Sequence, residues 1–236
     1  MCGRYVLATP IDELLSFFEA RLAPGVRDDY RPSYNVAPTE TALGLVEEEE
    51  HGRVLDEFRW GLVPSWAKDL SVGSRMFNAR AESIATKPSY RAAFEARRLA
   101  VIADGFYEWR KDGNGKRQPF YFTRADNEPM AFAGLWEVWR DRSAENRDRS
   151  WLRSCTIITT DANKEVSAVH DRMPVVLEQD ALELWIGDEL SEPDELEGLL
   201  RPAEEGTLSF VPVDRRVGRV EYKDPALIAP VAATEG

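Results

Sequence analysis

Leu99-Ala100-Val101-Ile102-Ala103 is an unbroken apolar run that stops at the turn residues Asp104-Gly105. A short apolar run bounded by a turn is typical of a strand that is buried on both faces. Three later segments, residues 119–123, 130–139 and 151–160, are rich in aromatic and β-branched residues, which also favour strands. The centre of the chain therefore predicts a core built mainly of β-sheet.

The segments before this centre predict one helix and one hairpin. Thr9-Pro10-Ile11-Asp12 has the pattern of a helix start, with a capping hydroxyl and proline at the first helical position. Residues 41–46 and 54–60 are strand candidates separated by an acidic turn that ends in His51-Gly52, so they predict a hairpin. Residues 32–38 predict an irregular, turn-rich connection.

The remaining segments predict helices around the sheet and one last strand. Helices are expected at residues 89–98, which are basic, and at 161–169, 180–186 and 194–201, with a strand at 208–213. We therefore predict an α+β fold: a single domain with a mainly antiparallel, strongly twisted, barrel-like β core flanked by helices. The domain is expected to span residues 1–230, with 231–236 as a flexible tail.

The charge of the chain is unusual for a protein that binds nucleic acid. Asp and Glu total 42 against 30 Lys and Arg, which gives a net charge of -12. A local basic groove can still bind phosphates if the acidic residues lie elsewhere. Acidic residues gather at 47–50, 141–148 and 188–205, whereas the middle of the chain is basic, with Arg75, Arg80, Lys87, Arg91, Arg97, Arg98, Arg110 and Lys111.

The cysteine and histidine content argues against disulfides, metals and other cofactors. Cys2 and Cys155 do not make a disulfide framework, and His51 and His170 are too few for a zinc cluster. His51 is expected to be turn surface. The chain shows neither a charged leader nor a window near the roughly 18 apolar residues of a membrane helix. We expect a cytoplasmic monomer without membrane contact.

Cys2 is the sharpest chemical feature of the sequence. Removal of Met1 would leave an amine and a thiol on neighbouring carbons of one residue. An α-amino group has a pKa of about 7.7 to 8.0, so part of it is an uncharged nucleophile near neutral pH. The amine can form an imine with an aldehyde, and the thiol can then close a five-membered thiazolidine ring. From position alone, Cys2 is better explained as a small residue after the initiator.

Five separated blocks add evidence that no single residue provides. They are Met1-Cys2-Gly3-Arg4-Tyr5, Tyr34-Asn35-Val36-Ala37-Pro38, Asn78-Ala79-Arg80-Ala81-Glu82, Ala103-Asp104-Gly105-Phe106-Tyr107-Glu108-Trp109 and His170-Asp171-Arg172-Met173-Pro174. In this order the blocks resemble the SRAP (SOS response-associated peptidase) family, and the resemblance covers nearly the whole chain.

The resemblance implies four catalytic residues. Met1 would be removed by the protein's own peptidase activity, and the freed Cys2 would crosslink to abasic sites in single-stranded or junction DNA. Asn78 would hold the cysteine and its adduct, and His170 would help to open the deoxyribose ring so that the aldehyde appears. Glu108 would move protons, and its neighbours Tyr107 and Trp109 should desolvate the carboxylate and raise its pKa. Outside the blocks, each of these residues has an ordinary structural explanation.

The resemblance also implies a DNA-binding surface. Arg4, Arg80 and Arg172 can make bidentate hydrogen bonds to phosphate oxygens. Trp66, Trp109 and Pro38 are candidates for stacking against exposed bases or wedging beside the lesion. Asn35 and Thr159 are expected to line the pocket. The other tryptophans weighed here are expected to be structural: Trp136, Trp139, Trp151 and Trp185.

Two other functions remain open at this point. A cysteine-type peptidase acting on other chains could use Cys2, Glu108 and His170. A non-covalent single-stranded DNA-binding module could recognise damage through Arg80, Trp66 and Trp109, and Cys2 would then be dispensable.

Overall fold

Five strands of the protein close into a barrel. The computed structural model describes residues 2–232 except for 27–29, 112–114, 142–149 and 188–191. The barrel order is β11-β10-β7-β4-β5, and a parallel pairing of β5 with β11 closes the ring. Its strands are β4 (Thr41–Glu48), β5 (Gly52–Trp60), β7 (Arg98–Ala103), β10 (Met130–Arg140) and β11 (Trp151–Asp161).

Four short strands extend the barrel. They are β2 (Arg21–Leu22), which pairs with β5, β13 (Val176–Leu177), which pairs with β10, and β6 (Asn78–Arg80) and β12 (Arg172–Pro174), which both pair with β11. Only the pairings of β5 with β11, β6 with β11 and β2 with β5 are parallel among the described strands. The predicted fold class, with a mainly antiparallel, barrel-like core in a single mixed α/β domain, is confirmed.

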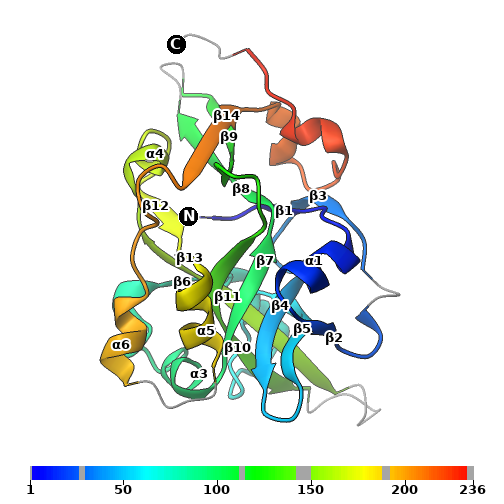
Figure 1. Ribbon diagram of the computed structural model, residues 1–236, viewed down its shortest axis with the longest axis vertical. Coiled ribbons are helices and arrows are strands. Elements are labelled where there is room, and N and C mark those ends of the chain that lie inside the picture. Colours follow the sequence, from blue (N-terminus) through cyan, green and yellow to red (C-terminus); the bar gives the residue numbers. More distant parts are fainter. Residues whose placement is uncertain (1, 27–29, 112–114, 142–149, 188–191, 233–236) are drawn as a thin grey trace.

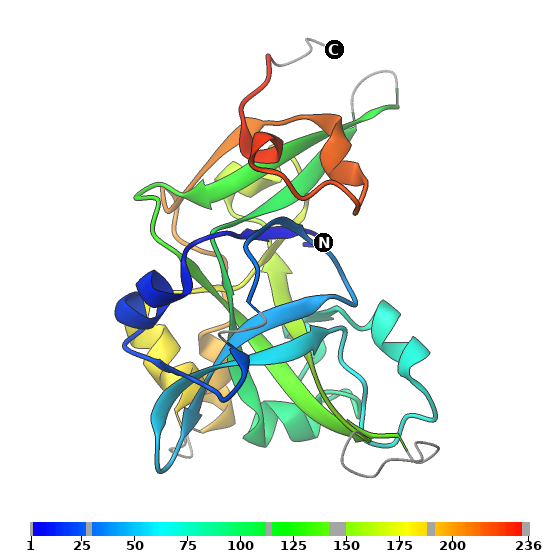
Figure 2. The same cartoon turned by 90° about the vertical axis from the view of Figure 1, so that its right-hand side faces the viewer.

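A second, antiparallel sheet lies across one end of the barrel (Figures 1 and 2). Its order is β14-β9-β8-β1-β3. The strands are β1 (Tyr5–Leu7), β3 (Ser33–Val36), β8 (Gly105–Lys111), β9 (Arg117–Arg124) and β14 (Leu208–Pro212). In both views β1 crosses the molecule at the height where this sheet meets the barrel.

The predicted turn at Asp104-Gly105 is where the chain leaves the barrel for the second sheet. A Cβ atom on Gly105 would lie 2.4 Å from the carbonyl oxygen of Phe122, so only glycine allows this close approach. The carboxylate of Asp104 accepts hydrogen bonds from the backbone N–H groups of Ala8 and Thr9 at 2.6 and 3.0 Å. Asp104 thereby ties the junction to the segment that follows β1.

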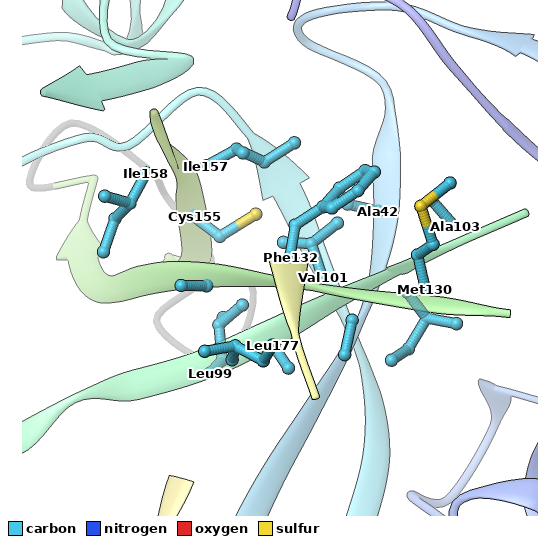
Figure 3. Packing of buried hydrophobic residues seen from close by; sticks show 14 of the residues in the cluster. Ala42, Leu99, Val101, Ala103, Met130, Phe132, Cys155, Ile157, Ile158 and Leu177 are labelled. Carbon is cyan, nitrogen blue, oxygen red and sulfur yellow. The ribbon is translucent and has the colours of Figure 1, made fainter. Parts of the chain in front are cut away.

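The barrel interior is apolar and fully packed. Leu99 and Val101 of β7, Phe132 of β10 and Ile157 of β11 converge there, and each is completely buried (Figure 3). Full burial of one such side chain contributes roughly 1.5–3 kcal/mol. The other face of β7 is covered by α5 (Gln179–Ile186), whose Trp185 donates a hydrogen bond to Leu99 O at 3.0 Å. The prediction of a strand buried on both faces is therefore confirmed.

The first two helices differ from their predicted limits. Helix α1 spans Ile11–Phe17, but its start has no side-chain cap because the Thr9 hydroxyl donates to Asp104 instead, at 2.7 Å. The predicted capping role of Thr9 is wrong. Helix α3 spans only Arg91–Ala96, since Arg98 already belongs to β7.

The irregular connection predicted at 32–38 is wrong for its centre, because Ser33–Val36 pair with β1 as strand β3. The predicted helix at 161–169 is also mostly wrong. Asp161 continues β11 and pairs with Arg172 of β12, and helix α4 covers only Lys164–Ser167, with Asn163 as its capping residue. The predicted hairpin, the strands around 119–123, 130–139 and 151–160, helix α5, helix α6 (Pro193–Gly198) and strand β14 are confirmed within a few residues.

Some predicted features lie outside the described residues. These are most of the acidic stretch 141–148, the start of the stretch 188–205 and the end of the tail 231–236. Among the helices that the structure describes, none has the length and apolar character needed to cross a membrane.

Candidate active site

Cys2 lies where the second sheet meets the barrel, and its position is fixed by β1 and β6. Strand β1 pairs with both β3 and β8, which holds the start of the chain against the barrel. The Cys2 side chain is fully buried, with Sγ 3.9 Å from the carbonyl oxygen of Arg4. Asn78, at the start of β6, donates from Nδ2 to the carbonyl oxygen of Cys2 at 2.6 Å. The predicted nucleophile and its predicted holder are therefore in direct contact.

Glu108 and His170 form a second pair beside Cys2. Glu108 comes from β8 and is 2% exposed, and burial raises the pKa of its carboxyl, as expected from its aromatic neighbours. His170 follows α4, and its Nε2 lies 3.9 Å from Glu108 Oε2. Burial, followed by the nearby charge of Glu108, raises the pKa of the Cys2 thiol well above its usual range. The site thus favours the neutral forms of both the thiol and the carboxyl group.

The imidazole of His170 has two partners on one nitrogen. Nδ1 accepts a hydrogen bond from the backbone N–H of Arg172 at 3.0 Å, which leaves the proton on Nε2, the nitrogen nearer to Glu108. Asp171 Oδ1 lies 2.9 Å from the same Nδ1, a contact that favours a proton there. Nδ1 of His170 therefore faces both a backbone donor and a carboxylate oxygen.

The four predicted catalytic residues come together although they are far apart in sequence. Cys2 lies just before β1 and Glu108 lies in β8 of the second sheet, whereas Asn78 and His170 come from segments attached to β11 of the barrel. We call Cys2, Asn78, Glu108 and His170 the candidate site. No group of three or more His, Cys, Asp or Glu side chains suited to a metal ion occurs in the described part of the chain.

Two residues predicted to contact DNA instead anchor the C-terminal segment. Arg4 donates to the carbonyl oxygens of Val217 and Gly218 at 2.7 and 3.2 Å, and also to Asn35 Oδ1 at 3.1 Å. Asn35 is fully buried and donates to the carbonyl oxygens of Val217, Arg219 and Tyr222 at 3.0 to 3.1 Å. Asn35 therefore has no exposed surface with which to contact DNA in this structure.

Two further predicted contacts are also occupied within the protein. Thr159 is fully buried, and its hydroxyl donates to Ala79 O at 3.3 Å. Arg172 binds Glu82, Asp161 and the carbonyl oxygen of Thr159. A phosphate could reach the terminal nitrogens of Arg172 only by displacing one of these groups.

The remaining predicted DNA contacts are accessible. Trp66 is 63% exposed, Arg80 is exposed, and Pro38 and Trp109 are half-buried. The basic cluster is smaller than the sequence predicts, because Arg98 binds backbone carbonyls such as Trp185 O at 2.7 Å. Arg97 forms an ion pair with Glu137 at 3.0 Å.

The expectation for the other tryptophans holds for three of the four. Trp185 is fully buried, Trp139 is 5% exposed and donates to Ala67 O at 2.8 Å, and Trp136 is half-buried. The prediction for Trp151 is wrong, since this side chain is 59% exposed. It lies at the start of β11, at the end of the strand remote from the candidate site, where Arg140 stacks over its ring.

Comparison with known proteins identifies the chain. A family model described as SOS response associated peptidase (SRAP) matches residues 1–220. The chain belongs to the SRAP family. It is 35% identical over 229 residues to abasic site processing protein YoqW of Bacillus subtilis, covering 97% of this chain and 99% of that protein. It is 32% identical to abasic site processing protein YedK of Escherichia coli, with 98% and 100% covered.

A solved structure shares the fold of this chain. A protein from Bacteroides thetaiotaomicron superposes with a TM-score of 0.87 over 98% of this chain and 100% of that chain. The sequence identity is 22%, so this likeness concerns the fold alone.

Two features of this SRAP domain were missed by the sequence analysis. The C-terminal segment around Val217 and Tyr222 covers Arg4 and Asn35, and no local pattern indicates a contact between residues so far apart in the chain. Glu82, in contrast, stands in one of the five blocks but received no role. Its bidentate contact with Arg172 could have been suspected only if the two blocks were known to be neighbours in space.

Proposed function

We propose that this SRAP protein processes abasic sites in DNA by forming a covalent thiazolidine with Cys2 after Met1 has been removed. The observation that carries the proposal is the convergence of a buried Cys2, held by Asn78, with the proton-transfer pair Glu108 and His170. The names of the relatives, which describe processing of abasic sites, agree with it. We further propose that the protein acts as a monomer on single-stranded or junction DNA, without a cofactor.

The chemistry starts at the sugar and the freed amine. His170 moves a proton from the C1′ hydroxyl to the ring oxygen of the abasic deoxyribose, which opens the ring and exposes the aldehyde. The uncharged amine of Cys2 then attacks the aldehyde carbon, and a proton passes from nitrogen to oxygen to give a carbinolamine. Asn78 keeps Cys2 in place through its carbonyl oxygen during this attack.

Glu108 donates a proton in the next step and accepts one from the Cys2 thiol in the step after it. Glu108 donates a proton to the carbinolamine hydroxyl, which leaves as water and gives an iminium ion; burial raises the pKa of this carboxyl, which favours its acting as the proton donor. The Cys2 thiol then loses its proton to the Glu108 carboxylate, and the sulfur adds to the iminium carbon. The ring closes as a neutral thiazolidine, one water is released in total, and Glu108 is protonated again.

Four residues that are exposed or half-buried provide the proposed contacts with DNA. Arg80 binds a phosphate, Trp66 and Trp109 stack on bases, and Pro38 wedges beside the lesion. The net charge of -12 opposes long-range attraction of DNA, so binding depends on these local contacts and weakens steeply with salt.

The protonation state of Cys2 favours crosslinking over a peptidase acting on other chains. A cysteine peptidase needs a thiolate, which usually comes from a lowered thiol pKa. Here burial raises the pKa of the Cys2 thiol. A neutral thiol is compatible with thiazolidine formation, because the amine attacks first and the thiol adds later to an activated iminium carbon.

A gel assay with a matched cysteine control tests the proposal. The mature protein is incubated with a uracil-containing oligonucleotide that has been treated with uracil glycosylase, and the products are separated on a denaturing gel. We expect a slowly migrating adduct with the wild type and with Cys155→Ala, which removes the other fully buried thiol, but not with Cys2→Ala. Equal adduct yields from Cys2→Ala and the wild type would refute the proposed nucleophile.

A further inference from the structure

Arg172 carries more hydrogen bonds than a phosphate-binding surface arginine needs. Its Nη1 donates to Glu82 Oε1 at 2.5 Å and to Asp161 Oδ1 at 2.7 Å. Its Nη2 donates to Glu82 Oε2 at 3.0 Å and to Thr159 O at 2.6 Å. Since each terminal nitrogen of a guanidinium carries two N–H donors, both nitrogens are fully used within the protein.

The Arg172 side chain is packed between these partners. It is only 11% exposed, and its Nε is buried without a hydrogen-bond partner among the described residues. The bidentate contact with Glu82 is the arrangement in which arginine binds a carboxylate most strongly and with the most defined geometry. The guanidinium is therefore held in one position before any DNA is bound.

The contacts of Arg172 connect the two segments that carry Asn78 and His170. Glu82 lies in the short helix η2 (Ala81–Ser83), directly after β6, whose first residue is Asn78. The backbone N–H of Arg172 donates to Nδ1 of His170 at 3.0 Å. One residue thus contacts the imidazole through its backbone and the segment after Asn78 through its side chain.

The sheet alone leaves this connection indirect. Strand β6 pairs with β11 at Ile157 to Thr159, and β12 pairs with β11 at Thr159 to Asp161. The segments of Asn78 and His170 therefore share β11, but both are short strands of three residues. The ion pair between Glu82 and Arg172 directly connects the two segments, just after the end of β6 and at the first residue of β12.

We infer that Glu82 is a positioning residue, which acts through Arg172 to set the distance between Asn78 and His170 during the reaction. This inference rests on the proposed function, because it concerns the rate of the same crosslinking step. It also assigns Arg172 a role within the protein in place of the predicted phosphate contact. A misplacement of about 1 Å between reacting groups can lower a rate by about a hundredfold.

The test separates the rate of crosslinking from the affinity for DNA. Crosslink formation is followed over time at increasing concentrations of protein, which gives a maximal rate and a half-saturating concentration. For Glu82→Gln we expect the maximal rate to fall about tenfold, because glutamine presents only one oxygen to the guanidinium. The half-saturating concentration should stay within about twofold of wild type, since no DNA contact is lost.

Glu178→Gln is the matched control. Glu178 accepts from Nη1 of Arg124 at 3.0 Å and is 56% exposed, close to the 52% of Glu82, but it lies at the start of α5 on a different part of the barrel. We expect this variant to crosslink as the wild type does. An equal fall in both variants would overturn the inference, because loss of any surface carboxylate would then explain it.

The other outcomes are equally decisive. An unchanged maximal rate in Glu82→Gln, or a rise in the half-saturating concentration that accounts for the whole effect, would overturn the inference. Binding to an oligonucleotide with a tetrahydrofuran in place of the abasic sugar, which has no aldehyde, gives the affinity separately. Absence of crosslinking in the wild type would instead refute the proposed function.

A double-mutant cycle gives a second readout. Arg172→Lys keeps the charge but loses the bidentate geometry, so we expect the same fall in maximal rate as for Glu82→Gln. Because the two residues act as one unit, Glu82→Gln combined with Arg172→Lys should be no slower than either single variant. Effects that multiply in the double variant would contradict a shared role.

Discussion

The barrel and the candidate site are built from opposite kinds of buried residue. In the barrel, apolar side chains such as Leu99 and Phe132 are fully buried and fill the interior. At the candidate site, where the second sheet meets the barrel, polar groups such as Glu108 are almost as deeply buried. Burial of apolar surface stabilises the fold, whereas burial of a carboxyl group opposes it.

The difference indicates how this fold separates stability from chemistry. The barrel closes through pairings among its own five strands, so it does not depend on the polar groups of the candidate site. Two of these groups are contacted by segments at the edge of the barrel, since Asn78 donates to Cys2 O and the Arg172 N–H donates to His170 Nδ1. We therefore expect changes in the barrel to act on stability and changes in the candidate site to act on the reaction.

The largest expected effect is in the barrel. Phe132→Ala removes a fully buried ring and should lower the free energy of unfolding by about 3–5 kcal/mol. Crosslinking at a temperature where this variant is folded should stay near the wild-type rate. Urea denaturation followed by tryptophan fluorescence, together with the gel assay, would show whether the two properties separate; a large rate loss in the folded variant would break the comparison.

Asn78→Ala should show the reverse pattern. It removes the hydrogen bond to Cys2 O, so we expect the maximal crosslinking rate to fall about a hundredfold, as for loss of one positioned donor. The free energy of unfolding should fall by only about 1 kcal/mol, the usual contribution of one hydrogen bond. A stability loss as large as that of Phe132→Ala would mean that Asn78 belongs to the structural part of the molecule.

Trp66→Ala should affect neither the fold nor the reacting groups. Trp66 is 63% exposed, so the free energy of unfolding should change by less than about 0.5 kcal/mol. If Trp66 stacks on a base, affinity for single-stranded DNA should weaken by about 1–3 kcal/mol. Fluorescence anisotropy with a labelled oligonucleotide measures this loss, and Trp151→Ala, whose exposed ring is remote from the candidate site, provides the control.

Glu108→Gln should slow the crosslinking reaction but stabilise the folded protein. The expected gain in the free energy of unfolding is small. Because burial raises the pKa of Glu108, the folded protein keeps this proton to higher pH than the unfolded chain does. Ionisation therefore opposes folding at every pH above the ordinary glutamate pKa of about 4.3. We expect a gain of about 0.5–2 kcal/mol at pH 7, as is common when a destabilising active-site group is replaced.

The pH dependence checks the sign of this effect. The gain from Glu108→Gln should shrink as the pH falls towards about 4, where the carboxyl is protonated in both the folded and the unfolded state. Urea denaturation at pH 4.5 and 7 measures it. A gain that is larger at the acidic pH would show that ionised Glu108 stabilises the fold.

The sequence predicted most of the barrel because its strands are local patterns. The apolar run at 99–103 and the aromatic and β-branched segments around 119–160 became β7, β10 and β11 of the barrel and β9 of the second sheet within a few residues. The helix predicted at 161–169 was mostly wrong because a tertiary pairing, Asp161 with Arg172, overrode the local preference. The Thr9 cap was wrong for the same kind of reason, since Asp104 binds its hydroxyl.

The sequence predicted which residues form the candidate site, but not their burial or their contacts. The five blocks contain Cys2, Asn78, Glu108 and His170, which the structure brings together. Sequence patterns did not indicate the burial of individual residues, so the interior positions of Asn35 and Thr159 and the exposed ring of Trp151 were not foreseen. The partners of Arg172 come from two other segments, and only the folded chain places them in contact.

Intact-mass spectrometry of the adduct tests the central claim most directly. The mature protein is exposed to an oligonucleotide with an abasic site, and one half of the sample is then treated with borohydride. The account predicts a mass equal to the protein without Met1 plus the oligonucleotide minus one water, unchanged by borohydride because a thiazolidine has no C=N bond to reduce. An adduct that retains Met1, or that gains two hydrogens on treatment, would contradict it.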